Sequence, residues 1–242
     1  MESRGAPLTS GQIADYLRDG YVIVRGFLGE SAVDGLRAEC ERIWAQEPIH
    51  EGNPRVQWRG LIDGARVADR LDPVIDLSPL FAAMAEDPRL IALACTLLGE
   101  APAIFKDKVI MKRPGTLGYG MHQDYPYWEH LGVPASDYVI CFFPLDPFDA
   151  ESGSIEMFPG LHAARVPPPP EDPLDSDESL IDLTRGQLLQ LAPGDVVVMH
   201  SLTPHRSPPN RSFRSRRVII LSYTKACHRG LRDRYARGRR TE

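Results

Sequence analysis

The stretch APGDVVVMHSLTPHRSPPNRSFRSRRVIILSYT, residues 192–224, decides the fold. It opens on a Pro-Gly-Asp turn, and the β-branched run Val196–Val198 follows at once. Because β-branched residues favour strands, this run predicts a strand. A polar loop containing His205 then leads to a second run rich in Val, Ile and Tyr, Arg216–Thr224. Strands that follow one another across short polar connections are typical of antiparallel sheets.

The same character extends toward the N-terminus. Residues 103–115 alternate like a strand that ends in a Pro-Gly turn, residues 137–146 form an apolar β-rich run, and residues 153–162 predict a short strand after a glycine. The 22 prolines and 20 glycines of the chain fit many turns between short strands. This succession predicts an antiparallel sandwich or barrel.

The N-terminal segment, residues 1–99, has a helical pattern instead. We expect helices over residues 9–20, 30–44 and 87–99, a short strand over 21–27, and an irregular stretch around Trp58. We therefore expect one domain over residues 1–242. It would consist of a helix-rich segment over 1–99, a β core over 100–225 and a basic tail over 226–242.

Residues 166–184 interrupt the β core with four consecutive prolines and a cluster of acidic residues. Such a composition does not pack as a core, so we expect an exposed loop. We favour a solvated linker between strands over a lid above a pocket. The basic tail is poor in apolar residues, and we expect it to fray.

Composition excludes several classes of protein. The net charge of −5 does not suggest a nucleic-acid binder. The four cysteines are scattered without a C-x-x-C pair, which disfavours a disulfide framework and a structural zinc site. The first residues lack the apolar region of a signal peptide, and no apolar run reaches membrane-spanning length. We therefore expect a soluble, cytoplasmic protein without nucleic-acid or membrane partners, and the oligomeric state stays open.

A candidate metal site begins at residues 121–128, MHQDYPYW. Alternate residues of a strand share a face, so His122 and Asp124 would present an imidazole and a carboxylate side by side. Of the remaining histidines, His200 and His205 follow a strong strand, and His200 is better explained as packed within it. Two histidine nitrogens and one carboxylate oxygen form the facial triad of Fe(II) oxygenases, although zinc accepts similar ligands.

An oxygenase that uses 2-oxoglutarate also needs a cation for the far carboxylate, and arginine suits it because its guanidinium binds a carboxylate in two places. Arg216 lies 11 positions after His205, at the start of a strand. Its neighbour Arg217 should face the other side of that strand, toward solvent.

Together, residues 121–128, 151–162 and 192–224 resemble the phytanoyl-CoA dioxygenase family of Fe(II)- and 2-oxoglutarate-dependent oxygenases. The opening residues 8–28 are also similar to the N-terminal segment of this family. The resemblance covers nearly the whole chain except the acidic insert and the basic tail. It implies a mainly β fold: a double-stranded β-helix (a jelly-roll, cupin-like core) with N-terminal helices packed on one sheet.

The resemblance also implies roles for single residues. His122, Asp124 and His205 match the iron ligands, Arg216 matches the arginine that holds 2-oxoglutarate, and Ser207 matches a hydroxyl on the same carboxylate. Arg70 falls near a basic residue that reaches the co-substrate in relatives. The implied activity is hydroxylation, or another oxidation, of an unactivated C–H bond of a small metabolite, with release of succinate and CO2. Relatives often have Trp where Met121 stands, and we expect no consequence for iron because this side chain alternates away from the ligands.

Several interpretations stay open. The triad would also serve a non-oxidative enzyme, such as a cupin-like hydrolase or isomerase with zinc, and a binding protein on a degenerate barrel is a third possibility. Tyr125, Tyr127 and Trp128 either line the substrate pocket or pack under a loop. Lys106, Lys108 and Lys112 share one strand face, for which exposure to solvent is the simpler interpretation. Gln123 should point away from the ligands and be replaceable.

Overall fold

The computed structural model describes residues 8–238. The expected absence of a signal peptide rests partly on residues 1–7, and the basic tail ends in residues 239–242. Both segments lie outside the described residues. No helix within residues 8–238 is long and apolar enough to cross a membrane.

The helices begin and end where the sequence supplies capping residues. Helix α1, Ser10–Asp19, has the N-cap Thr9, whose hydroxyl accepts the Gln12 backbone N–H at 3.2 Å. The Thr9 backbone N–H in turn donates to the side-chain oxygen of Gln12 at 2.9 Å, which completes a capping box. The helix ends at Gly20, whose φ of +83° is a left-handed conformation that favours glycine. The other helices are α2 (Glu30–Gln46), α3 (Pro79–Ala85), α4 (Pro88–Leu98) and α5 (Leu231–Gly238).

The strands form two antiparallel sheets. The larger sheet has seven strands in the order β1 (Tyr21–Val24), β9 (Val196–His200), β6 (Tyr138–Pro144), β11 (Arg216–Lys225), β4 (Pro102–Lys112), β3 (Arg66–Leu71) and β2 (Val56–Gly60). The smaller sheet has four strands in the order β5 (Tyr119–His122), β10 (His205–Ser207), β7 (Glu156–Met157) and β8 (Gln187–Leu188). The expected mainly β fold with a cupin-like core is confirmed.

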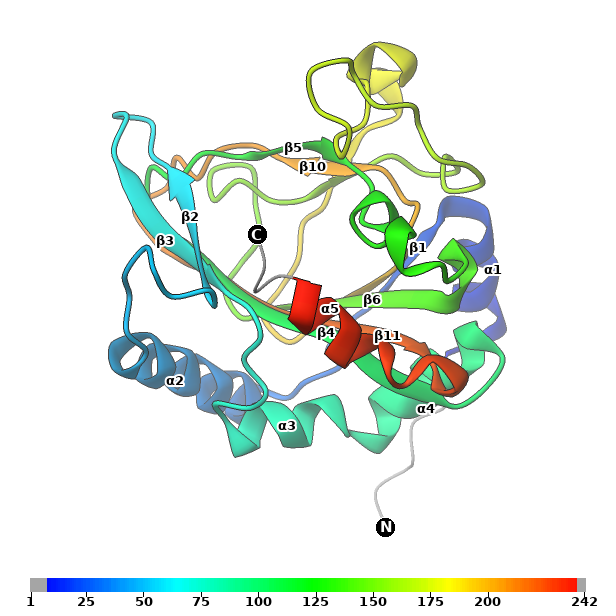
Figure 1. Cartoon of the computed structure of the whole chain (residues 1–242), viewed down its shortest axis with the longest axis horizontal. Coiled ribbons are helices and arrows are strands. Elements are labelled where there is room, and N and C mark those ends of the chain that lie inside the picture. Colours follow the sequence, from blue (N-terminus) through cyan, green and yellow to red (C-terminus); the bar gives the residue numbers. More distant parts are fainter. Residues whose placement is uncertain (1–7, 239–242) are drawn as a thin grey trace.

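The larger sheet is covered on both faces, which explains its nearly continuous apolar strands. In Figure 1, α2, α3 and α4 lie along one face of this sheet, and β5 and β10 lie across the other. Side chains of β4 alternate accordingly: Val109 and Met111 pack with the helices, and Ile110 packs between the sheets. Lys108 and Lys112 share the face of Ile110 and therefore point between the two sheets.

The stretch around Trp58 is not irregular, contrary to our expectation. It contains the antiparallel pair β2 and β3, with Val56 paired to Leu71 and Gly60 paired to Arg66. The strand signal is weak because β2 and β3 carry several polar residues, and β2 is the edge strand of the sheet. This pair matters for the site, because it adds a further wall beside β4.

The tail does not fray over its described residues. Residues Leu231–Gly238 form helix α5, which lies across β4 in Figure 1. Leu231 is only 3% exposed, and the ring of Tyr235 contacts that of Phe105 with the centroids 5.4 Å apart. Two apolar residues at helical spacing thus anchor a segment whose other side chains are mostly charged.

Candidate metal centre and its cavity

His122, Asp124 and His205 come together between the two sheets. The pairing of β10 with β5 places His205 directly opposite His122, and their ring centroids are 4.2 Å apart. One potential ligand atom from each of the three residues lies within 4.8 Å of the others. This is the only group of its kind found within the described residues.

Asp124 reaches the group by a different route from the one that strand alternation predicts. Strand β5 ends at His122, and Asp124 has helical backbone angles at the start of the short 3-10 helix Tyr125–Tyr127. The i and i+2 spacing therefore works through a turn, in which the chain folds back and keeps the carboxylate beside the imidazole.

Both histidines are held by backbone carbonyls through the same ring nitrogen. Nδ1 of His122 lies 2.8 Å from the Gly120 carbonyl, and Nδ1 of His205 lies 3.0 Å from the Thr203 carbonyl. A carbonyl only accepts, so each Nδ1 carries the proton and donates it. Nε2 of each ring is then left unprotonated, which is the form that binds a metal ion.

The charge states suit a metal ion as well. Burial lowers the pKa of His122 to about 3, helped by the neighbouring His205 ring, and burial also lowers the pKa of His205. Burial acts to raise the pKa of Asp124, but Lys108 and the two histidines outweigh it, so that pKa is lowered. At neutral pH the group presents two neutral imidazoles and one carboxylate, a donor set that fits Fe(II).

The surroundings of Gln123 argue against our expectation that this residue is replaceable. It is fully buried, and its amide nitrogen donates to the carbonyls of Leu202 at 2.6 Å and Ala164 at 3.0 Å. Its amide oxygen accepts the backbone N–H of Val166 at 2.9 Å. Gln123 does point away from the ligands, and there it ties together the turn before β10 and the start of the insert.

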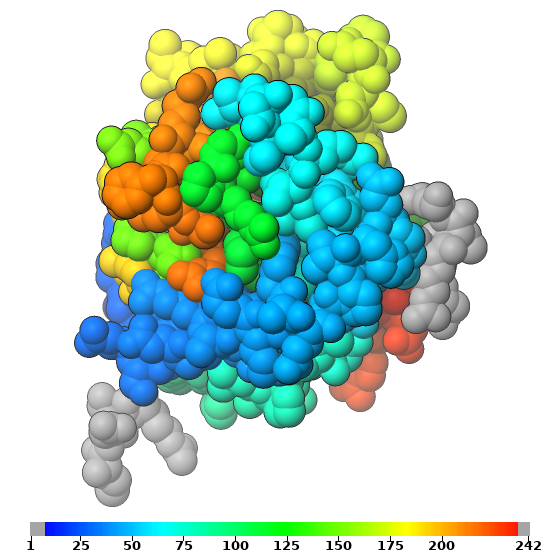
Figure 2. Space-filling model, turned by 90° about the vertical axis from the view of Figure 1, so that its left-hand side faces the viewer, coloured from blue at the N-terminus to red at the C-terminus, as the bar shows by residue number. Residues whose placement is uncertain are grey.

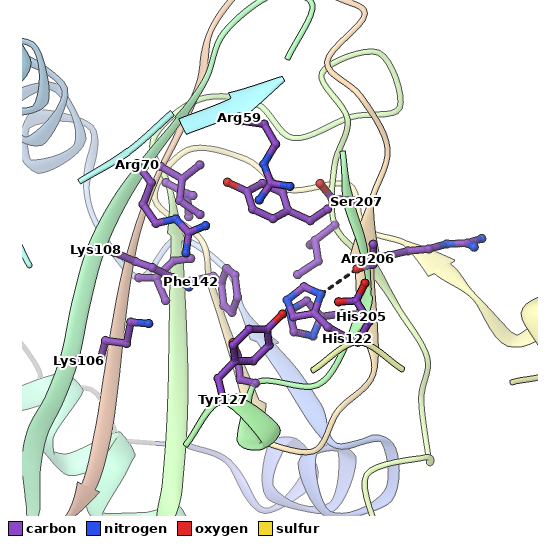
Figure 3. Close-up of a pocket in the computed structure, with 18 of the residues that line it drawn as sticks. Arg59, Arg70, Lys106, Lys108, His122, Tyr127, Phe142, His205, Arg206 and Ser207 are labelled. Carbon is purple, nitrogen blue, oxygen red and sulfur yellow. Dashed lines mark hydrogen bonds between the residues drawn. The ribbon is translucent and has the colours of Figure 1, made fainter. Parts of the chain in front are cut away.

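A cavity of about 310 Å³ opens beside the three residues. Figure 3 shows its two walls, with Arg70, Lys106 and Lys108 on one side and His122 and His205 on the other. Apolar side chains line some of the cavity: Ile110, Phe142, Ile155, Val218 and Ile220. Polar and charged side chains form most of the rest, so the cavity fits a small, charged molecule better than a long apolar one.

Arg216 lies in this cavity, and Arg217 lies on the other face of β11, as strand alternation predicts. Arg216 is 4% exposed, its guanidinium lies 4.2 Å from the centre of the Phe148 ring, and it donates one bond to the Gly153 carbonyl. Its buried Nε has no hydrogen-bond partner among the described residues. Burial lowers the pKa of Arg216 to about 10, so the guanidinium stays charged at neutral pH, and its Nε–H is available to donate a hydrogen bond.

Ser207 also lines the cavity, and Lys112 supports it from behind. The Lys112 ammonium nitrogen lies 2.7 Å from the Ser207 hydroxyl, 3.2 Å from the Gly153 carbonyl and close to the Pro208 carbonyl. Lys112 is fully buried, opposite Arg216 across the β4–β11 pair. We expected it to face solvent, but the sheet that covers β4 shields this face.

The three aromatic residues after Asp124 divide between the two interpretations. Tyr127 lines the cavity and is 37% exposed, with its ring centroid 6.2 Å from that of His122. Trp128 touches the cavity but is 1% exposed, packed edge-on against Phe105. Tyr125 does not line the cavity and instead contacts Tyr138 in the core between the sheets.

The positive wall of the cavity is the feature that sequence reasoning underestimated. Lys106 and Lys108 line it rather than facing solvent, Arg70 joins them from β3, and Arg59, which we did not single out, reaches it from β2. A signal was present in the sequence, because Lys106 and Lys108 are separated from the apolar Ile110 by an even number of residues and so share its face of the strand. A strand that is covered on both faces has no face toward solvent.

The acidic insert reaches the site too, so the prediction of a plain solvated linker is wrong. The backbone of Asp175 forms an isolated antiparallel β-bridge with that of His122. Ser176 donates its backbone N–H to the Met121 carbonyl at 2.9 Å. Asp172 and Asp175 line the cavity. Figure 2 shows the insert, in yellow, as the upper rim of the molecule beside the β2–β3 pair in cyan.

The chain is similar to known proteins over most of its length. The model of the phytanoyl-CoA dioxygenase family matches residues 16–218. The methylphosphonate hydroxylase of Gimesia maris is 27% identical over 94% of this chain and 85% of its own length. A 2-aminoethylphosphonate dioxygenase from an uncultured bacterium is 25% identical over 90% of this chain and 82% of its own.

Solved structures share the fold. EctD from S. alaskensis, crystallised with 2-oxoglutarate and 5-hydroxyectoine, superposes with a TM-score of 0.77 at 20% identity, covering 94% of this chain and 79% of that protein. The epimerase SnoN, in complex with Fe3+ and alpha-ketoglutarate, superposes with a TM-score of 0.75 at 24% identity, covering 89% of this chain and 83% of that protein. The family match spans most of the sequence, and the chain belongs to the phytanoyl-CoA dioxygenase family.

Proposed function

We propose that this protein is an Fe(II)- and 2-oxoglutarate-dependent dioxygenase that oxidises a C–H bond of a small metabolite and releases succinate and CO2. The observation that carries the proposal is the group of His122, Asp124 and His205, whose ligand atoms lie within 4.8 Å of one another beside a cavity. Three protein ligands on one side leave positions open for other molecules.

In this proposal His122 and His205 bind iron through Nε2, because their Nδ1 atoms are engaged with backbone carbonyls. Asp124 adds a negative charge that partly offsets the metal. When bound, the iron supplies the oxidative chemistry with O2 and 2-oxoglutarate that amino-acid side chains lack. The backbone carbonyls fix the orientations of both rings.

Arg216 and Ser207 would hold the far carboxylate of 2-oxoglutarate. The unpartnered Nε of Arg216 can donate to a carboxylate oxygen, and the Ser207 hydroxyl can donate to another while it accepts from Lys112. The Phe148 ring orients the guanidinium from one side. The apolar side chains of Phe142, Val218 and Ile220 also line this cavity.

Tyr127 is the aromatic residue that we propose for substrate contact, because it is exposed at the cavity and its ring faces that of His122 edge-on. The insert would enclose the substrate through Asp172 and Asp175. Enclosure matters for an oxidative enzyme because it keeps reactive species away from solvent.

The two relatives described above suggest the first substrates to test. One is named for methylphosphonate and the other for 2-aminoethylphosphonate, both small and charged. The dimensions and polarity of the cavity are compatible with molecules of this size.

The test is a paired assay of succinate and oxidised product with purified protein, Fe(II), 2-oxoglutarate, O2 and each candidate substrate. We expect equimolar succinate and product, and no product with the Asp124→Ala variant. Product without succinate, or equal turnover with zinc, would contradict the proposal and favour a non-oxidative metal enzyme.

A further inference from the structure

Two basic side chains of the cavity, Lys108 and Arg70, are separate from Arg216 and Ser207, the pair that we propose for the far carboxylate of 2-oxoglutarate. We propose that Lys108 and Arg70 form a binding site for a compact oxyanion of the primary substrate, of the phosphoryl, sulfonyl or carboxylate type. This inference rests on the proposed function, which assigns Asp124 to the iron and Arg216 to 2-oxoglutarate.

The two side chains lie next to each other because of the sheet register. Arg70 on β3 pairs with Ile110 on β4, and Lys108 precedes Ile110 by two residues, on the same face. Figure 3 shows both residues on the wall opposite His122 and His205. An anion held there would leave the rest of the substrate to extend toward the metal ligands.

Other cations of the cavity already have partners. Lys106 lies 3.3 Å from Asp72 and 2.6 Å from the Tyr235 hydroxyl. Arg59 lies 3.7 Å from Asp69 and stacks on the Tyr119 ring at 3.9 Å. A further one, Arg206, pairs with Glu156 at 2.6 Å and with Glu178 at 3.0 Å.

Arg70 and Lys108 differ from them. Within residues 8–238, neither side chain has an ion pair or a hydrogen bond, and Nε of Arg70 is buried without a partner. Arg70 only faces the Tyr119 ring, at 5.8 Å. Burial and the neighbouring Lys106 lower the pKa of Lys108 to about 7, so its ammonium form is destabilised and a bound anion would favour it. Unpaired charges in a cavity cost free energy of desolvation, which an incoming anion offsets.

A charge balance gives the same result. The positive charges of Fe(II) and Arg216 are matched by Asp124 and the two carboxylates of 2-oxoglutarate. Lys108 and Arg70 are then left without an ion-pair partner of their own, because Asp69 and Asp72, whose charges act on Arg70, pair with Arg59 and Lys106. They match an oxyanion with up to two negative charges, and the guanidinium of Arg70 can bind two of its oxygens.

The carboxylates of the insert do not neutralise this wall. The backbone of Asp175 forms a β-bridge with that of His122 at the end of β5, so Asp175 reaches the cavity from that side. Asp172 belongs to the same insert and also lines the cavity. Neither forms an ion pair with Lys108 or Arg70 in the described structure. The cavity is thus positive on the β3–β4 side and negative on the insert side, so the anion of the substrate has one favourable orientation.

The test measures binding rather than turnover. Protein loaded anaerobically with Fe(II) and 2-oxoglutarate is titrated with inorganic phosphate in a calorimeter at constant ionic strength, with sulfate and acetate as parallel arms. We expect one saturable phosphate site in the wild type. Lys108→Met and Arg70→Met should each weaken it at least about tenfold, the loss expected for a hydrogen-bonded charge. Lys108→Arg should restore most of it.

The matched control is Lys225→Met, which removes a lysine from the neighbouring strand β11, where it pairs with Asp137 outside the cavity. It should bind phosphate like the wild type. Unchanged phosphate binding in both cavity variants would overturn the inference, and so would loss of 2-oxoglutarate binding by them, which would assign these cations to the co-substrate. If the wild type takes up no 2-oxoglutarate, the proposed function itself fails, and phosphate binding still reports on the two cations.

Discussion

At the scale of single residues, the site depends on side chains between and behind the ligands as much as on the ligands. Gln123 stands between two metal-ligand candidates and makes three hydrogen bonds with backbone groups of two other segments. Lys112 lies behind Ser207 without lining the cavity. Both residues position groups that would touch iron or 2-oxoglutarate.

The variant Gln123→Ala should lower the free energy of unfolding by about 2 kcal/mol or more, because it leaves a buried N–H and two carbonyls without partners. Chemical denaturation measures this. The control is Gln190→Ala, which truncates an exposed glutamine. Equal stability of the two variants would contradict the role that we assign to Gln123.

Lys112 predicts a pH dependence of stability. Burial and the nearby charges of Arg216 and Arg59 lower its pKa to about 6, with Asp69 acting in the opposite direction, from an ordinary value of 10.5. Between these two values the unfolded chain binds more protons than the folded one, so the free energy of unfolding rises with pH.

We therefore expect the wild type to gain stability relative to Lys112→Met as pH rises from 6 to 8.5, by up to about 1.4 kcal/mol per pH unit. Denaturation at several pH values checks this. Lys225→Met should show no such trend, because Lys225 is protonated in both states over this range. A constant difference between wild type and Lys112→Met would contradict the prediction.

At the scale of elements, the helices and strands that the sequence predicted are those whose own residues favour that structure. Helix α1 has a capping box and a C-terminal glycine, and β11 has a β-branched run, so both were predictable. Strands β2 and β3, the last two strands on one side of the larger sheet, were missed because tertiary pairing rather than residue preference makes them strands.

The candidate site likewise contains some residues that the sequence predicted and others that it did not. His122, Asp124, His205 and Arg216 have a fixed spacing that a sequence displays, and the structure brings all four to one cavity. The positive wall was not predictable with the same ease, because Arg59 and Arg70 come from the missed strands. The contribution of the two aspartates of the insert depends on how that segment folds back, which composition does not encode.

Arg165, directly before the insert, is one of several residues that connect the insert to the body of the protein. Its guanidinium lies 2.6 Å from Glu129 and 2.9 Å from the Pro173 carbonyl. The variant Arg165→Ala should raise the rate of limited proteolysis within residues 166–184 several-fold. Global stability should fall by less than about 1 kcal/mol, because the ion pair is partly exposed. The exposed Arg211 supplies the control variant Arg211→Ala, and equal cleavage of both would show that this anchor is unimportant.

At the scale of the whole molecule, the two sheets hold a candidate metal centre, in which backbone carbonyls and β-sheet register position the two histidines. A metal ion that binds only the folded protein raises its stability. We expect Fe(II), added anaerobically, to raise the melting temperature of the wild type by several degrees, and chelation to reverse the change. The Asp124→Ala variant should show little response, and an equal response in that variant would contradict the ligand assignment.

The central claim is that His122, Asp124 and His205 hold an iron ion to which 2-oxoglutarate binds, with Arg216 on its far carboxylate. The most direct measurement is the visible absorption of the protein with Fe(II), titrated anaerobically with 2-oxoglutarate. We predict a saturable absorption change in the wild type, none in Asp124→Ala, and a dissociation constant raised at least about tenfold in Arg216→Met, as expected for loss of a charge-assisted bond. No spectral change in the wild type, together with tight binding of zinc, would contradict the account.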